Sequence, residues 1–363
     1  MSLVLSVKNT AVIACAGSGK TTFIVKEALK VKDSNVLITT YTLENVDQIN
    51  QSILEQNGFI PANITVVSWF AFLLREGVRP YQNYLSKLPR ARSVFFQTKS
   101  IPFHKKENYL TASFDIYSNK ASEFAVECNT KSGGKVIGRL EKIYSHIFLD
   151  ELQDFAGYDL DLIEALFHST LIVTAVGDPR QSTFSTNSSA KNKHLKGKNV
   201  DVWLQQQQKA GVVTIENRTN CRRCNQQICD FSDLLFPSYP ATTSENNEVT
   251  GHDGIFVLPK SQVKQYVIRF DPVILRWNRL SDTMSYPALN FGISKGRTYN
   301  RVLIFPTKPM VKFLQTKTLD TKSDLSKFYV AVTRARYSVV FVVDDSKISS
   351  FAFDVYSSDQ DNK

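Results

Sequence analysis

Hydrophobic residues along the chain fall into short runs that are rich in β-branched side chains. Apolar runs without polar alternation are typical of strands that are buried on both faces of a sheet. We therefore predict strands at Ala11–Ala14, Val36–Thr40, Ile64–Ser68, His146–Asp150, Leu171–Val176, Val212–Glu216, Val273–Trp277, Val302–Phe305 and Ser338–Val343.

Stretches with helical spacing lie between these predicted strands. In Leu325–Arg336, an apolar stripe runs through Leu325, Phe328, Tyr329 and Val332, at spacings i, i+3, i+4 and i+7. Alternating strands and helices predict an α/β fold around parallel sheets. Residues 183–199 are polar and basic, and residues 237–254 are rich in Pro, Ser, Asn and Gly, so both are predicted to be loops.

The length of 363 residues suggests about two domains, each able to bury its own core. We predict an N-terminal domain at 1–209 and a C-terminal domain at 210–363. Residues 77–140 have weaker periodicity and many aromatic side chains, which indicates a small insertion in the first domain.

Charge and composition narrow the class of protein. The chain has 44 Lys and Arg residues against 34 Asp and Glu residues, which gives a net charge of +10. This charge favours a polyanionic partner such as nucleic acid. A basic protein without such a partner would have the same net charge. A hydrophobic content of 42% excludes a disordered chain. No run of about 18 apolar residues and no signal peptide pattern occur, so we expect no membrane association and a cytoplasmic location.

The five Cys residues are scattered, which is typical of a reduced compartment rather than of a disulfide framework. Cys221 and Cys224 have the spacing of a metal-binding pair, and Cys229 follows them. No second pair lies at a suitable spacing, so no structural zinc is expected.

A glycine-rich segment, Ala14-Cys-Ala-Gly-Ser-Gly-Lys-Thr-Thr22, follows the first predicted strand and opens a helix, which is the context of a P-loop. Its glycines let backbone N–H groups approach phosphate oxygens, and the helix start adds a positive end. A Lys can reach the β- and γ-phosphates and a Thr hydroxyl can bind Mg²⁺. The segment therefore predicts an ATP (or GTP) phosphate site made of Ala16, Gly17, Ser18, Gly19, Lys20, Thr21 and Thr22, with Thr21 also a metal ligand.

A second acidic element, Asp150-Glu-Leu-Gln-Asp154, ends an apolar strand and should lie at the same sheet edge, beside the P-loop. Asp150 is expected to hold Mg²⁺, and Glu151 to orient and deprotonate the attacking water. A solvated acidic helix cap is the alternative, and the P-loop makes it the weaker one. The pair favours an ATP hydrolase over a kinase.

Four motifs occur in order: Asp150–Asp154, Val176-Gly-Asp-Pro-Arg-Gln181, Asn290–Tyr299 and Tyr329–Arg336. This series resembles the superfamily 1 helicases of the UvrD/Rep/PcrA type. The resemblance implies two RecA-like P-loop NTPase domains, with ATP and Mg²⁺ bound at the cleft between them. It implies ATP-driven movement along single-stranded DNA with 3′ to 5′ polarity.

The resemblance also assigns roles to residues outside the P-loop. Gln181 resembles the glutamine that senses the γ-phosphate, and Arg334 resembles the arginine finger. Arg223 is the best match to a second catalytic arginine, with Arg222 as the alternative. Lys295 and Gly296 lie in the segment Asn290–Tyr299 that resembles the family's motif V, and they are assigned to the nucleotide.

Other positions match segments that contact single-stranded DNA in the family. Aromatic side chains suit this role because every base has a π-face. Core packing is the alternative for Tyr41 and Trp69, and it is preferred for Phe70. The assigned positions are Thr40, Tyr41, Ser68, Trp69, Phe184 and Gly292, and the basic surface near residues 183–199 is expected to lie along the strand.

The chain also departs from the family pattern. Only a short connector separates Asn278 from Lys295, so the accessory subdomains are predicted to be reduced or absent. The P-loop has no glutamine motif before it, which leaves adenine selectivity open. Short proteins of this build resemble helicase subunits of bacterial anti-phage systems such as Gabija. The alternative function is therefore an ATPase or DNA-sensing subunit of a complex that includes a nuclease subunit.

Overall fold

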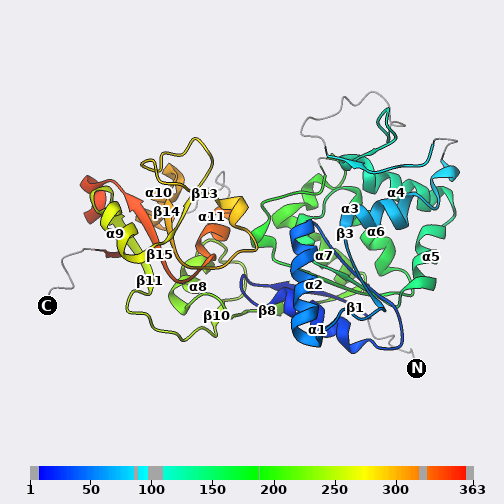
Figure 1. Ribbon diagram of the computed structural model, residues 1–363, viewed down its shortest axis with the longest axis horizontal. Helices are drawn as coiled ribbons and strands as arrows, with labels where there is room; N and C mark the ends of the chain where they lie inside the picture. The colour runs from blue at the N-terminus through cyan, green and yellow to red at the C-terminus, as the bar shows by residue number, and fades with distance from the viewer. Residues whose placement is uncertain (1–7, 86–88, 97–108, 188, 319–324, 357–363) are drawn as a thin grey trace. The chain divides into compact units, whose positions relative to one another are not determined.

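The computed structural model describes residues 8–85, 89–96, 109–187, 189–318 and 325–356. It contains two compact units, each built around a parallel β-sheet (Figure 1). The first unit comprises the described residues up to Ile13 together with Lys20–Asn217. The second comprises Ala14–Gly19 and the described residues from Arg218 onward. The predicted α/β fold with two RecA-like parallel sheets is confirmed.

The sheet of the first unit has the strand order β3-β2-β6-β7-β1-β8. The pairs β3–β2, β2–β6, β6–β7 and β7–β1 are all parallel, so these strands end at one edge of the sheet. All residues of β2 are buried, as expected for a strand covered on both faces. The strands are β1 (Asn9–Ala14), β2 (Val36–Thr40), β3 (Ile64–Ser68), β6 (His146–Leu149), β7 (Ile172–Gly177) and β8 (Val213–Arg218).

Helices lie on both sides of this sheet (Figure 1). Their ends follow local rules, since Thr42 caps α2 by accepting a hydrogen bond from the Asn45 N–H, and Gly58 ends it in the left-handed conformation. The helices are α1 (Lys20–Lys30), α2 (Leu43–Asn57), α3 (Trp69–Phe72), α4 (Ala121–Lys131), α5 (Lys135–Ile143), α6 (Tyr158–Phe167) and α7 (Val200–Lys209).

The described part of the predicted insertion, 77–85, 89–96 and 109–140, packs into the core of the first unit. Phe124, Ala125 and Cys128 of α4 are fully buried in the same hydrophobic cluster as the sheet. Gly77, in the π-helical turn Leu73–Val78, allows this packing, because a Cβ there would lie 2.8 Å from the Cβ of Ala125. A short parallel pair, β4 (Val94–Phe95) and β5 (Ile116–Tyr117), stands apart from the main sheet.

The sheet of the second unit has the order β13-β12-β14-β15-β11-β16, and its neighbouring strands are parallel. Strand β11, which lies between β15 and the edge strand β16, was not predicted, because short apolar runs do not distinguish strand from helix by periodicity. The strands are β11 (Gly254–Pro259), β12 (Val273–Arg276), β13 (Leu289–Asn290), β14 (Tyr299–Phe305), β15 (Ala335–Val343) and β16 (Asp354–Val355). A separate parallel pair joins β9 (Asn220–Cys221) to β10 (Thr243–Ser244). Of these two strands, β10 lies inside the predicted loop 237–254.

The helices of the second unit are α8 (Gln226–Asp233), α9 (Val263–Phe270), α10 (Lys308–Thr316) and α11 (Leu325–Val332). The predicted helix 325–336 therefore ends earlier than expected, at Val332. The hydroxyl of Thr333 donates to the carbonyl of Tyr329, and β15 begins at Ala335. This short turn between α11 and β15 leaves Arg334 at the start of a strand.

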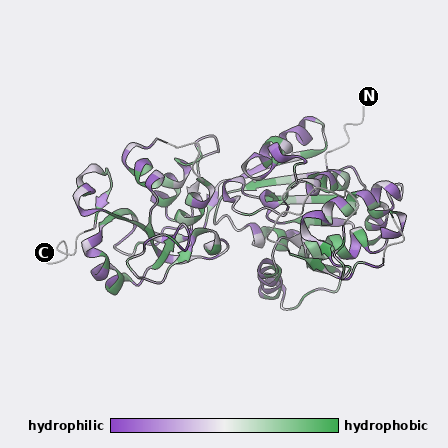
Figure 2. Ribbon diagram, turned by 90° about the horizontal axis from the view of Figure 1, so that it is seen from above, coloured by the Kyte–Doolittle hydropathy of each residue, from purple (hydrophilic) through white to green (hydrophobic). Residues whose placement is uncertain are grey.

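Hydrophobic residues concentrate on the strands, while the helices present mixed faces (Figure 2).

The first sheet includes β8, which lies beside β1, so the change of unit at Arg218 falls later than the predicted division at 209/210. Within the described residues, no helix is long and apolar enough to cross a bilayer.

The buried carboxylate of Asp159 ties several segments of the first unit together. It accepts hydrogen bonds from the indole N–H of Trp69 at 2.7 Å, from the hydroxyls of Ser122 and Thr186, and from the amide of Asn187 at 3.1 Å. Burial raises the pKa of Asp159, and these hydrogen bonds partly oppose the shift. The predicted loop 183–199 is thus fixed at its start, and 3₁₀ turns shape its second half.

We expect Asp159→Ala to lower the free energy of unfolding of the first unit by about 3–5 kcal/mol, because it leaves several buried donors without an acceptor. Asp161→Ala is the matched control. Asp161 pairs with Lys191 at the surface, and its loss should cost less than about 1 kcal/mol. Thermal melting of both variants measures the difference, and equal small losses would contradict the structural role of Asp159.

Candidate functional site

The predicted phosphate loop has the backbone geometry that such a loop requires. Gly17 and Gly19 have φ values of 74° and 77°, in the left-handed region that glycine adopts without strain. Lys20 is the first residue of α1, and the first turn of α1 carries no acidic residue. The Ser18 Oγ is buried without a hydrogen-bond partner among the described residues. A loop of this kind at a helix start fits an oxygen-rich anion.

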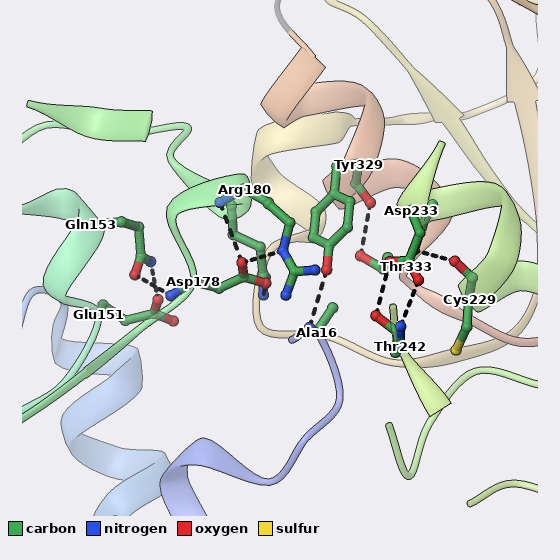
Figure 3. Close-up of polar contacts among 12 residues, drawn as sticks. Ala16, Glu151, Gln153, Asp178, Arg180, Cys229, Asp233, Thr242, Tyr329 and Thr333 are labelled. Atoms are coloured by element: carbon green, nitrogen blue, oxygen red, sulfur yellow. Dashed lines mark hydrogen bonds and ion pairs between the residues drawn. The ribbon is translucent and has the colours of Figure 1, made fainter. Parts of the chain in front are cut away.

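The loop packs against other residues of the second unit. The Ala16 N–H donates to the Tyr329 hydroxyl at 3.2 Å, as Figure 3 shows, and the Gly17 carbonyl accepts from the Arg222 N–H at 2.9 Å. A Cβ at Gly17 would lie 2.7 Å from the Cβ of Arg223 and 2.9 Å from the Sγ of Cys221. Glycine is therefore required at position 17 for a steric as well as a conformational reason.

The acidic strand end lies one strand further from the P-loop strand than the sequence suggested. Asp150 follows β6, and β7 separates β6 from β1. Two inter-strand spacings amount to about 10 Å. Asp150 is 4% exposed, and its Oδ2 accepts from the Thr40 hydroxyl at 3.3 Å. The Asp150 carboxylate and the Thr21 hydroxyl are oxygen donors of the kind that Mg²⁺ prefers, so this donor set fits the predicted metal.

Glu151 adopts a backbone conformation that is rare for its residue type. Its φ and ψ are 56° and 46°, in the left-handed region, which costs roughly 1–2 kcal/mol for a residue with a Cβ. The amide of Gln153 donates a hydrogen bond to the Glu151 carboxylate (Figure 3). Backbone strain of this kind clusters at functional sites, which supports the role predicted for Glu151.

Gln153 also links the acidic strand end to the end of β7. Its side-chain oxygen accepts from the Asp178 N–H at 2.8 Å, and Gly177 makes room for it, because a Cβ there would lie 2.6 Å from that oxygen. The Asp178 carboxylate in turn accepts from the Arg180 Nε at 2.8 Å and from the Gln181 side-chain amide at 2.9 Å. Asp178 is fully buried and Arg180 nearly so. Glu151 and Gln181 are therefore members of one hydrogen-bonded network.

Sequence reasoning assigned no role to Gln153, Asp178 or Arg180. A polar cluster directly after an apolar strand was the available signal, as was an Asp before a Pro, a pattern that caps a helical turn. Asp178 is such a cap for the 3₁₀ turn Pro179–Gln181, where its carboxylate accepts from the Arg180 N–H.

The two arginines predicted in the second unit meet around Thr333. Arg223 Nη1 donates to the Thr333 carbonyl at 3.0 Å, and Arg334 Nη2 donates to the Thr333 hydroxyl at 3.3 Å. Arg222 instead forms an exposed ion pair with Glu245 at 3.1 Å. This geometry favours Arg223 over Arg222 as the arginine associated with Arg334.

Arg334 is buried, and backbone carbonyls hold its guanidinium. Its Nε donates to the Val330 carbonyl at 3.0 Å and its Nη1 to the Arg297 carbonyl at 3.3 Å. Arg297 follows Lys295 and Gly296, so the structure brings this predicted nucleotide segment to Arg334. Gly296 has a φ of 82°, which the turn before β14 requires.

Two of the residues predicted to contact nucleic acid have fully buried side chains. Trp69 is fully buried between Phe72 and Phe155, with its N–H on Asp159, so it is a core residue. Thr40 is also fully buried, and its hydroxyl is hydrogen-bonded to Asp150 and Asn45. Both lie at strand ends, where sequence alone does not tell an inward side chain from an outward one.

The remaining predicted contact residues have varied settings. Ser68 is partly exposed and caps α3 by accepting from the Ala71 N–H. Tyr41 is partly exposed and packs against Phe70, whose ring is 6% exposed as expected for a core residue. Phe184 is 45% exposed. Gly292 is partly exposed in the 3₁₀ turn Phe291–Ser294, in the second unit.

The three cysteines Cys221, Cys224 and Cys229 are buried together in the second unit. Hydrogen bonds from the thiols of Cys224 and Cys229 lower the pKa of Cys221. Across the described residues, no group of three or more His, Cys, Asp or Glu side chains is arranged to hold a metal ion.

We expect Gly17→Ala to reduce nucleotide affinity at least tenfold. The methyl group of the alanine must displace Arg223 and Cys221, and the positive φ at position 17 is strained for a residue with a Cβ. Gly58→Ala is the matched control. Gly58 has a φ of +82°, but no atom lies within 4 Å of the position that its methyl group would take, so only the backbone strain of about 1 kcal/mol applies. Titration with a fluorescent ATP analogue measures both. Wild-type affinity in Gly17→Ala would show that the loop does not bind phosphate.

Two family models match the chain. The first, described as an AAA domain, matches residues 2–187. The second, described as the viral superfamily 1 RNA helicase core domain, matches residues 135–343. Each covers more than half of the 363 residues, and together they contain both strand-end clusters and the arginines of the second unit.

Individual relatives agree with these models. A putative ATP-dependent DNA helicase of Acanthamoeba polyphaga mimivirus is 24% identical over 290 residues, covering 77% of this chain and 36% of the relative. Solved structures similar in fold include the arterivirus nonstructural protein 10 helicase with DNA, at 16% identity and a TM-score of 0.50, and the same helicase alone, at 16% and 0.49. The alignments cover 94% and 95% of this chain and 61% and 62% of those chains. The chain thus spans about a third of the curated relative and about three fifths of these structures. On the two family matches, the chain belongs to the superfamily 1 helicases.

Proposed function

We propose that this protein hydrolyses ATP to move along single-stranded DNA in the 3′ to 5′ direction and so separates strands. The observation that carries the proposal is the network at the carboxyl edge of the first sheet. It joins the strained Glu151 through Gln153 and Asp178 to Gln181. Membership of the superfamily 1 helicases supports the same function.

In the proposed reaction, a water molecule attacks the γ-phosphorus of ATP, and the bond from that phosphorus to the oxygen of the leaving ADP breaks. Glu151 accepts the proton of the water, and the Gln181 amide orients the water or a γ-phosphate oxygen. Lys20 contributes positive charge to the β- and γ-phosphates. Mg²⁺, held by Thr21 and Asp150, would supply further charge neutralisation at the phosphates.

Arg223 and Arg334 remain the proposed arginines for the γ-phosphate. Both guanidinium groups are bound to Thr333 or its neighbours, so one movement of the turn between α11 and β15 would shift them together. Lys295 and Gly296 adjoin Arg297, whose carbonyl holds Arg334, and they are proposed to act on the nucleotide through that turn.

DNA is the proposed substrate because the mimivirus relative is named a DNA helicase and one structure of similar fold was determined with DNA. The viral family model is described as an RNA helicase core, so RNA is the matched competitor in every assay. Tyr41 and Phe184, which are partly or largely exposed, are the proposed base contacts in the first unit.

We expect single-stranded DNA to raise the ATP turnover of the purified protein, and Glu151→Gln to reduce that turnover by at least a hundredfold while nucleotide binding persists. Glu55→Gln is the control, because Glu55 is exposed on α2. A phosphate-release assay with DNA, RNA and no nucleic acid gives the rates. Full turnover in Glu151→Gln would refute the proposed base.

Duplexes with a single-stranded tail at either the 3′ or the 5′ end test the direction. Displacement only from the 3′-tailed duplex is the expected result, and displacement only from the 5′-tailed duplex would overturn the polarity. In a third outcome, DNA stimulates ATP turnover while neither duplex is displaced until a co-purifying nuclease is added. That result would favour the alternative function, a subunit of a larger complex, over an independent motor.

A further inference from the structure

A row of aromatic rings extends from the strand ends of the first unit to residues 89–96, the described stretch that contains β4. Tyr41 directly follows β2 and Phe70 lies two residues after β3, and the last residues of these strands, Thr40 and Ser68, are register partners. The Tyr41 and Phe70 rings lie 5.9 Å apart, and the Phe96 ring meets Phe70 edge to face at 5.0 Å. Phe70 is buried, whereas Phe96 is 65% exposed. The row therefore begins at the sheet edge and ends in an open aromatic face.

The backbone that carries Phe96 is held firmly by its neighbours. The buried side chain of Gln82 donates to the Pro89 carbonyl at 2.9 Å and accepts from the Ala91 N–H at 2.9 Å. Arg79 Nε donates to the Ala91 carbonyl at 2.8 Å. These bonds, and the pairing of β4 with β5, fix the segment 89–96, which we name the strap.

The strap presents basic and aromatic side chains to solvent. Arg90 and Arg92 are exposed on either side of the buried Ala91, and Phe95 and Phe96 are 45% and 65% exposed. Arg90, Arg92 and Phe96 are separated by even numbers of residues, which is the spacing of side chains that share one side of an extended chain. The exposed ring of Phe96 offers a flat face on which a base can stack.

This combination fits single-stranded nucleic acid better than a protein or a duplex. A single strand offers unstacked π-faces together with a regular row of phosphates, and grooves that bind it pair aromatic platforms with positive charge. A duplex hides its base faces, and the two exposed arginines of the strap, in a chain of net charge +10, favour a polyanion over a protein surface of mixed charge. The row is also continuous with Tyr41, a proposed base contact.

We propose that the strap is a binding site for single-stranded nucleic acid, with Phe96 stacking on a base and Arg90 and Arg92 contacting phosphates. The proposal rests on the function proposed above and assigns to the strap the portion of the strand beyond Tyr41. It gives residues 89–96 a direct role in binding the substrate.

Replacement of the exposed ring tests the proposal. We expect Phe96→Ala to weaken binding of a fluorescein-labelled oligothymidylate about tenfold, measured by anisotropy without nucleotide, and Phe96→Trp to restore it. Phe59→Ala is the matched control, because Phe59 is 63% exposed and precedes β3, at the opposite edge of the sheet. Thermal melting should be alike in all three variants, since each side chain is largely exposed.

The phosphate contacts have a separate signature. Arg90→Gln with Arg92→Gln should reduce the slope of log affinity against log salt concentration by about 1.4, which is about 0.7 for each phosphate contact to a single strand. Lys32→Gln with Lys142→Gln is the control, since both lysines are exposed and lie shortly before β2 and β6, at the opposite edge.

The outcomes separate the two proposals. If the wild-type protein binds no single strand, the proposed function itself fails. If the wild type binds but Phe96→Ala behaves like Phe59→Ala, and the salt slope of the arginine variant is unchanged, the strap is not a binding site while the function stands. Weaker binding in Phe96→Ala that Phe96→Trp restores supports the strap.

Discussion

The buried carboxylate of Asp178 organises the carboxyl edge of the first sheet. It is fully buried and forms an ion pair with Arg180, whose side chain is almost fully buried. Burying a charge is costly unless partners satisfy it, and here the Arg180 side chain, the Arg180 N–H and the Gln181 amide all donate to it. Removing the Arg180 side chain would leave the buried carboxylate without its counter-charge. The position of Gln181 is thus determined by an interaction that the fold of this edge requires.

The same network reaches Glu151 through Gln153, and it explains how a strained residue is retained. Glu151 occupies a left-handed backbone conformation that its Cβ disfavours, and the side chain of Gln153 is bound at once to Glu151 and to the backbone of Asp178. Gly177 completes the arrangement, because any side chain there would occupy the space of Gln153. Gln153, Gly177 and Asp178 together therefore determine the position of Glu151, the proposed base.

Sequence reasoning was strongest where chemistry and strand ends coincide. The P-loop, the carboxylates after β6 and the polar cluster after β7 were all found at strand ends, because a parallel sheet gathers such ends at one edge. The order of strands was not available, so Asp150 was expected beside the P-loop strand, although β7 intervenes. Thr40 and Trp69 were assigned to nucleic acid, yet both side chains point into the core, where Asp150 and Asp159 bind them. β11 was missed because a short apolar run carries no period. Such features depend on long-range packing, which local patterns do not encode.

The central claim is that Gln153 couples the strained Glu151 to the buried Asp178, and the kinetics of Gln153→Ala test it most directly. The variant keeps the P-loop and the acidic residues but breaks the link between them. We predict that the kcat of nucleic-acid-stimulated ATP hydrolysis falls at least tenfold while the Kd for nucleotide stays near the wild-type value. Gln206→Ala, at an exposed position of α7, should match the wild type in both. An undiminished kcat in Gln153→Ala would contradict this coupling.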